Sequence, residues 1–136
     1  MGVYPISHKA VPKEIPEPMK SEIDEAQLCF AVGAFRACLS MCEAALEAVW
    51  RDQNAAGLNG LKEKGLISQN LFAQATEVRL WANVAKHEFV HQPLSREDAE
   101  ELISYLEDIL DEVYVKPARR ADLRQKREQL GKSPNT

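Results

Sequence analysis

This sequence lacks the features that mark disulfide-rich, membrane-spanning or secreted proteins. Its 136 residues include only three cysteines, an odd number that does not form a disulfide framework. No apolar run approaches the roughly 18 residues that a membrane span needs, and the N-terminus lacks the basic-then-apolar order of a signal peptide. We therefore expect a cytoplasmic protein without membrane contact, in which Cys38 and Cys42 are buried, reduced thiols.

The composition is that of a folded helical domain. Hydrophobic residues make up 45% of the chain and charged residues 28%, a balance that argues against disorder. No segment alternates between apolar and polar residues with the period of a strand, whereas four segments repeat apolar residues with helical spacing. The sequence therefore predicts an all-α fold, a four- to five-helix up-down bundle.

Capping residues, glycines and prolines predict where the helices begin and end. We expect four long helices: one capped by Ser21 with Asp24, one over 35–53, one over 69–88 capped by Ser68, and one that follows a cap at Ser95. Residues 54–60 are rich in Gly and Asn and predict a loop. Residues 61–65 are expected to form at most a short helical piece that ends at Gly65.

Two segments flank the predicted bundle domain, residues 21–117. Residues 1–20 form a predicted extended arm, because prolines exclude a regular helix through that segment: Pro5, Pro12, Pro16 and Pro18. Pro117 is expected to end or kink the last helix of the bundle. Residues 118–136 then form a basic polar helix or tail.

Charge is divided unevenly along the chain. Residues 1–115 hold 10 Lys and Arg against 19 Asp and Glu, whereas residues 116–136 hold 7 against 2. Five basic residues of the tail are candidates for binding the phosphates of RNA or DNA: Arg119, Arg120, Arg124, Lys126 and Arg127. The tail could equally contact an acidic helix of its own or another subunit, or be solvated. No aromatic residue lies among the arginines to stack on bases.

The residues that best fit catalysis are Arg79, Asn83 and His87. Their spacing of four places them on one face of a helix, beside an apolar stripe, as a semi-buried polar row near a groove. Neutral His87 could take the proton of an RNA 2′-hydroxyl while Arg79 stabilises charge on the phosphate. In the alternative, the polar row fastens the helix by hydrogen bonds and Arg79 pairs with a carboxylate.

Residues 87–91 also spell His-Glu-x-x-His, the pattern of zinc proteases. That chemistry requires both histidines on one helix, and Gln92-Pro93 places His91 at or beyond the helix end. No predicted strand is present to hold a peptide substrate. We therefore regard a zinc protease as the weakest interpretation and expect no metal site and no cofactor.

An ordered set of short motifs resembles a known family. The set is Glu25-Ala26, Gly33-Ala34-Phe35-Arg36-Ala37, Ala45-Leu46-Glu47, the row Arg79, Asn83 and His87, and Ser95 with Asp98-Ala99-Glu100. Over residues 3–120 it resembles the family called domain of unknown function 4145, and through it the HEPN superfamily of helical bundles. The resemblance implies a bundle that often dimerises in defence, restriction or toxin systems. It also implies, in some members, metal-independent RNase activity at a dimer groove, with Arg79, Asn83 and His87 as the matching positions.

Two departures from the family pattern favour a member without catalysis. Leu80 follows Arg79 where catalytic members carry a polar residue, and seven residues separate Arg79 from His87, a longer interval than usual. Glu43 stands where relatives tend to carry a basic residue. We therefore expect a homodimeric interaction module of a defence- or restriction-type system that binds a partner protein or nucleic acid. The alternative is an RNase that uses His87 and Arg79 at the dimer groove.

Overall fold

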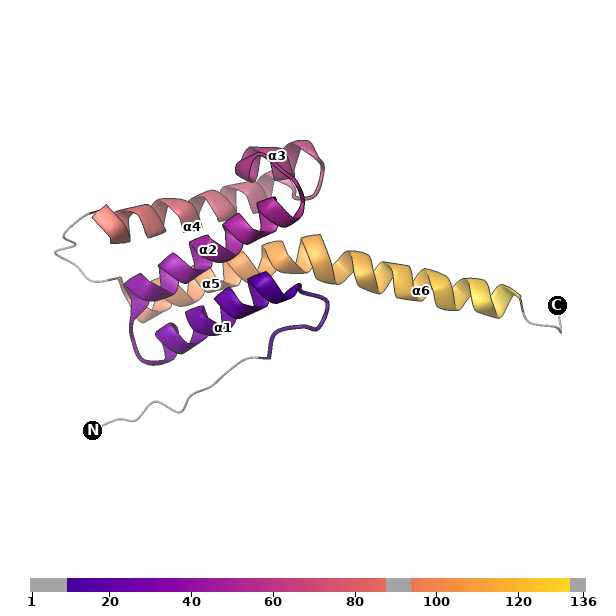
Figure 1. The fold of residues 1–136 in the computed structure, drawn as a ribbon, viewed down its shortest axis with the longest axis horizontal. Coiled ribbons are helices and arrows are strands. Elements are labelled where there is room, and N and C mark those ends of the chain that lie inside the picture. The colour runs from indigo at the N-terminus through magenta and orange to yellow at the C-terminus, as the bar shows by residue number, and fades with distance from the viewer. Residues whose placement is uncertain (1–9, 88–93, 133–136) are drawn as a thin grey trace.

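The computed structural model describes residues 10–87 and 94–132, and the regular structure in these ranges is helical throughout (Figure 1). This confirms the predicted all-α class. The elements in chain order are α1 (Glu17–Ala31), α2 (Phe35–Asp52), α3 (Gly57–Glu63), α4 (Gln69–His87), α5 (Arg96–Leu110), the π-helical turn η1 (Asp111–Val115) and α6 (Lys116–Gly131).

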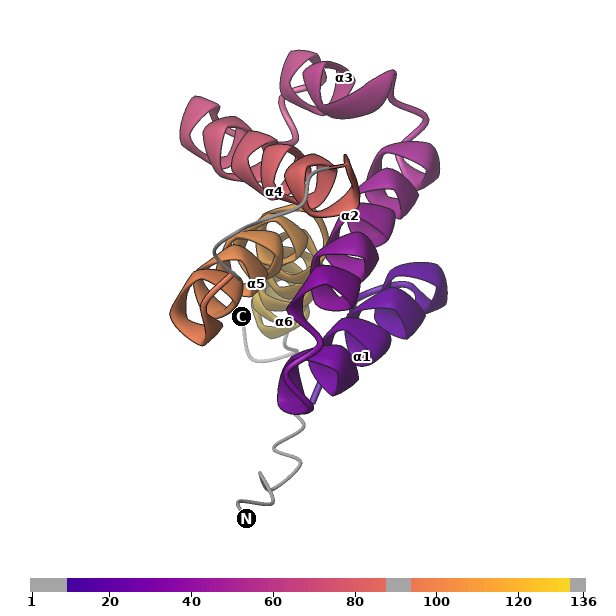
Figure 2. The same cartoon turned by 90° about the vertical axis from the view of Figure 1, so that its left-hand side faces the viewer.

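Helix α2 is the centre of the bundle. It contacts α1, α3, α4 and α5, and Figure 2 shows these helices grouped around it. The reason lies in its apolar face, because Leu39, Cys42, Leu46 and Val49 recur at intervals of three and four and are all fully buried. The core therefore forms along the predicted stripe of this helix.

The first helix begins earlier than the sequence analysis predicted. Helix α1 starts at Glu17 after an extended Pro16, so Pro18 lies in its first turn and Ser21 lies inside the helix rather than at its cap. Proline is tolerated there because the first-turn N–H groups have no partner within the helix. The early start brings fully buried Met19 into the core.

The predicted loop over 54–60 is also shorter in the structure. Asn54 and Gly57 adopt positive φ angles of 57° and 71°, and α3 begins at Gly57. Gly60 lies inside this short helix, where a Cβ atom would come within 3.1 Å of the Ala55 side chain. The glycines therefore permit a tight turn into α3 instead of a long loop. The predicted end at Gly65 is confirmed by its φ of 76°.

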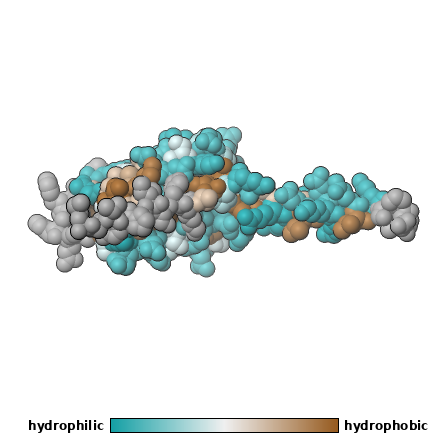
Figure 3. Space-filling view, turned by 90° about the horizontal axis from the view of Figure 1, so that it is seen from below, coloured by the Kyte–Doolittle hydropathy of each residue, from teal (hydrophilic) through white to brown (hydrophobic). Residues whose placement is uncertain are grey.

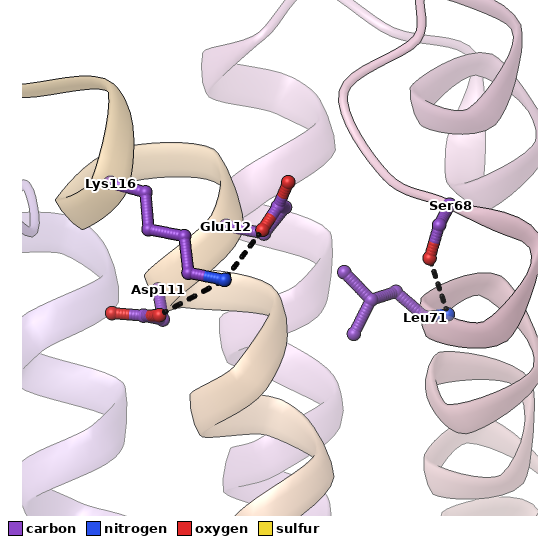
Figure 4. A network of polar contacts seen from close by, with 5 residues as sticks. All are labelled: Ser68, Leu71, Asp111, Glu112 and Lys116. Atoms are coloured by element: carbon purple, nitrogen blue, oxygen red, sulfur yellow. Dashed lines mark hydrogen bonds and ion pairs between the residues drawn. The ribbon is translucent and has the colours of Figure 1, made fainter. Parts of the chain in front are cut away.

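Two predicted helix caps are confirmed. The Ser68 Oγ atom accepts a hydrogen bond from the Leu71 backbone N–H at 3.2 Å, as Figure 4 shows. The Ser95 Oγ atom accepts one from the Asp98 N–H at 3.0 Å. Each bond satisfies a backbone donor that has no partner within its own helix.

Helices α5 and α6 form one rod that is interrupted only by η1. Pro117 removes a backbone donor and would collide with the carbonyl four residues earlier in a regular helix. The π turn just before it widens the spacing, so that the Lys116 N–H bonds the Asp111 carbonyl. The Lys116 ammonium also lies 3.2 Å from Glu112 and 3.8 Å from Asp111 (Figure 4). The rod continues past Pro117, and α6 extends away from the bundle (Figure 1).

Candidate functional site

The polar row predicted on the third long helix lies on α4, which is continuous from Gln69 to His87. Arg79 and Asn83 line one cavity of about 670 Å³ between α4 and the start of α3. Both side chains are exposed, so the expected semi-buried row is wrong for these two residues. The reason is that fully buried Val78 and Ala82 occupy the core-facing positions beside them.

Arg79 is held against an aromatic ring. Its guanidinium carbon lies 5.3 Å from the centre of the Trp50 ring on α2. A cation over an indole face gains electrostatic attraction without losing its outward hydrogen-bond donors. The contact therefore fixes the stem of Arg79 and leaves the charge available at the cavity.

A carboxylate shares this cavity. Glu43 on α2, whose side chain is 13% exposed, lines it together with Arg79 and Asn83. Glu43 also forms an ion pair with Lys86 of α4. The pair of Glu43 and Lys86 is neutral overall, so it adds no net positive charge for a phosphate group that binds at Arg79.

A further contact fixes the end of α4. The Arg36 Nε atom, near the start of α2, donates a hydrogen bond of 2.7 Å to the Ala85 carbonyl. The last carbonyls of a helix have no partner within it, so an arginine is a suitable donor there. Arg36 belongs to the motif set in the sequence, but nothing in the pattern indicated this partner 49 residues away.

His87 is the final residue of α4, and its side chain lies outside the described part of the structure. The same holds for Glu88 and His91 of the His-Glu-x-x-His pattern. The proposed roles of His87 as base or acid therefore stay predictions. Among the residues that the structure describes, no group of three or more His, Cys, Asp or Glu side chains is arranged to hold a metal ion.

The basic tail residues lie apart from the polar row. Arg119, Arg120, Arg124, Lys126 and Arg127 are all exposed on α6. Helix α6 contacts η1 and none of the other described elements. The structure therefore does not bring the two sets of candidate residues together. Two large apolar side chains on this helix were not among the predicted site residues: Leu123 and Leu130, which are 67% and 76% exposed.

The cysteine pair is buried in the core, as predicted. Cys38 and Cys42 lie one turn apart on α2 and are both fully buried. A hydrogen bond from Cys42 lowers the pKa of the Cys38 thiol, although burial opposes this, whereas the same bond and burial raise the pKa of Cys42 well above its usual value. At neutral pH these thiols are shielded from reagents in solution.

Comparisons with known proteins identify the family. No helix in the described ranges combines the length and apolar content needed to cross a bilayer. No curated protein and no solved structure matches the chain. The family model described as "Domain of unknown function (DUF4145)" matches residues 24–126, which span α1 to α6. Because this stretch is well over half of the 136 residues, the chain belongs to the DUF4145 family.

Proposed function

We propose that this protein is a HEPN-like interaction module of a defence- or restriction-type system. It acts as a homodimer and binds a partner protein or a nucleic acid. The observation that carries the proposal is α6, a 16-residue basic helix that projects from the bundle with two leucines exposed. A lone helix of this length is only marginally stable in water, and most helices gain stability by packing an apolar face. Helix α6 therefore supports a role in binding.

The cavity at Arg79 and Asn83 supports the same view. Arg79 rests on the Trp50 ring and Glu43 presents a carboxylate to the same space. A site that cleaves RNA must stabilise added negative charge on phosphate, and the pair of Glu43 and Lys86 supplies no net positive charge for this. The two departures in the sequence, at Leu80 and Glu43, point in the same direction.

The second candidate function is a metal-independent RNase. The observation in its favour is that Arg79 and Asn83 share one cavity, as a phosphate-binding pair would. The test is incubation of the purified protein with unstructured RNA in EDTA, beside a His87→Ala variant. We expect the RNA to stay intact with both proteins. Cleavage that resists EDTA and disappears in the variant would establish the enzyme and overturn the module.

Two measurements test the binding role directly. Light scattering at tens of micromolar should give twice the 15.3 kDa mass of the chain, and a strict monomer would contradict the homodimer. If nucleic acid is the partner, a chain without residues 118–136 should lose salt-sensitive retention on RNA or DNA, because phosphate contacts by Lys and Arg release counterions. Unchanged retention would exclude the tail as the nucleic-acid contact.

A further inference from the structure

The rod formed by α5, η1 and α6 has opposite charge in its two halves. Helix α5 and η1 carry eight acidic side chains and one arginine, whereas α6 carries six basic and two acidic side chains. Lys116 at the junction pairs with Asp111 and Glu112. Two such rods laid antiparallel would place each acidic half beside a basic one.

The basic residues of α6 also lie on one face of the helix, around its two exposed leucines. At 100° per residue, Leu123 and Leu130 lie within about 20° of each other on the helix surface. All six basic residues lie within about 100° of Leu123. They are Lys116, Arg119, Arg120, Arg124, Lys126 and Arg127. Asp122 is on the margin of this face, and Glu128 lies beyond it. Helix α6 therefore presents an apolar centre with a basic rim, and Figure 3 shows hydrophobic surface set among hydrophilic surface along it.

The body of the protein has a groove of complementary character. It lies between the segment before α1, α1 itself and the junction of α5 with η1, and its volume is about 330 Å³. Val11, Ile15 and Ile23 form an apolar wall. Three acidic residues, Glu107, Asp108 and Asp111, also line the groove. Asp108 accepts a hydrogen bond from Gln74 of α4, and Asp111 pairs with Lys116.

Among the residues that the structure describes, one polar atom at this groove has no hydrogen-bond partner. This is the Oε1 atom of Gln27, a residue that lines the groove; it is buried, and no residue in the described ranges donates a hydrogen bond to it. A buried carbonyl oxygen in this state costs free energy unless a donor reaches it. Arginine carries five N–H donors in a planar fork, so an arginine side chain that enters the groove can supply that donor.

We propose that α6 of one copy docks in this groove of a second copy, and that the exchange is mutual. This rests on the proposed homodimer and names its contact. Leu123 and Leu130 pack on the apolar wall, and the arginines on the rim pair with the carboxylates. An exchange related by a two-fold axis is closed, so assembly stops at two chains. Helix α6 has 16 residues and is about 24 Å long, which is close to the length of about 22 Å of the 15-residue acidic helix α5.

The structure favours a second copy over other occupants. Helix α6 of the same chain cannot fill this groove, because Val115 lines the groove and α6 leads away from that point (Figure 1). Pairing of one α6 with another would set two basic faces against each other, which is destabilising. A nucleic-acid backbone would pair with the arginines but leave Leu123 and Leu130 in water. An acidic groove with an apolar wall can pair with the arginines and also bury the two leucines.

The test is a charge exchange between two variants. Arg120→Glu with Arg127→Glu reverses the rim of α6, and Asp108→Arg with Asp111→Arg reverses the groove. Sedimentation equilibrium of each variant alone should show a dimer dissociation constant raised at least about tenfold over wild type. An equimolar mixture should recover the dimer, because both contacts of the mixed pair join opposite charges. Leu123→Ser with Leu130→Ser should also weaken the dimer, and these exposed residues can change without loss of the fold.

The matched control changes the net charge by the same amount on the opposite face of α6. It combines Ala121→Glu, Gln125→Glu, Gln129→Glu and Lys132→Gln, and it should dimerise as wild type does. A wild-type monomer would overturn the contact and the homodimer together. A dimer that withstands reversal of α6, or a mixture that does not recover, would overturn the contact and leave the homodimer. If the variant with a reversed α6 rim loses retention on RNA while it still dimerises, nucleic acid rather than a second copy binds α6, and the docking is overturned.

Discussion

Single side chains connect segments that lie far apart in the sequence. The Tyr114 hydroxyl in η1 donates a hydrogen bond of 2.6 Å to the Asp52 carboxylate at the end of α2. Burial, together with this carboxylate, raises the pKa of Tyr114 above its usual value of 10. The bond joins the start of the projecting rod to the central helix, so it holds the direction of α6 relative to the bundle.

Replacement of Tyr114 by phenylalanine should remove about 1 kcal/mol from the free energy of unfolding at pH 8. The folded-state pKa is raised, so the contribution is complete below pH 10 and is lost as the pH rises further. Urea unfolding at pH 8 and pH 11 measures the difference. Equal stability of both proteins at pH 8, or a difference that does not shrink at pH 11, would contradict the assignment. Asp52→Asn in a double-mutant cycle isolates the pair.

The three cysteines provide a test of the burial of single side chains. Cys38 and Cys42 are fully buried, whereas Cys29 is half-buried and has a pKa raised by burial and by Glu25. A Cys29→Ser variant should therefore resist a thiol reagent at pH 8 and react at both remaining cysteines only after unfolding. Rapid labelling of the folded variant would show that α2 opens locally. The wild-type protein, which should label slowly at Cys29, is the control.

At the scale of the elements, helical periodicity and capping predict most of the fold. The limits of α2, the caps at Ser68 and Ser95 and the end at Gly65 were all predictable, because each depends on residues within one or two turns. The start of α1 was not, since burial of Met19 outweighs the prolines around it. The contacts from Arg36 to Ala85 and from Glu43 to Lys86 join residues more than 40 positions apart, which no local pattern reveals.

Two serines that resemble each other in sequence should respond differently to alanine. Ser95→Ala removes a cap from α5 and should cost about 1 kcal/mol of unfolding free energy. Ser21 is exposed inside α1, so Ser21→Ala should leave stability unchanged or raise it slightly, because alanine is the better helix former. Chemical denaturation of both variants beside wild type gives the comparison. A loss of stability at Ser21 equal to that at Ser95 would mean that α1 begins at the predicted cap.

At the scale of the whole molecule, the described residues form a packed bundle and one helix that projects from it. The basic composition of α6 was visible in the sequence, but its isolation from the bundle was not, because a basic helix could have folded back on the acidic α5. The π turn at η1 is the reason that it does not, since it carries the chain past Pro117 without a reversal. The sequence placed Arg79 and Asn83 on one face of a helix near a groove. It did not indicate that α2 and α3 supply the other walls of their cavity.

If α6 is stabilised by a second copy of the chain, as we propose, its amides should be protected from hydrogen exchange in the dimer. In the wild-type protein at tens of micromolar, the amides of residues 118–130 should exchange at least about tenfold more slowly than in the Arg120→Glu, Arg127→Glu variant. The amides of α2 should exchange equally in both, and the opposite-face control should match wild type. Equal exchange of α6 in wild type and variant would contradict the account.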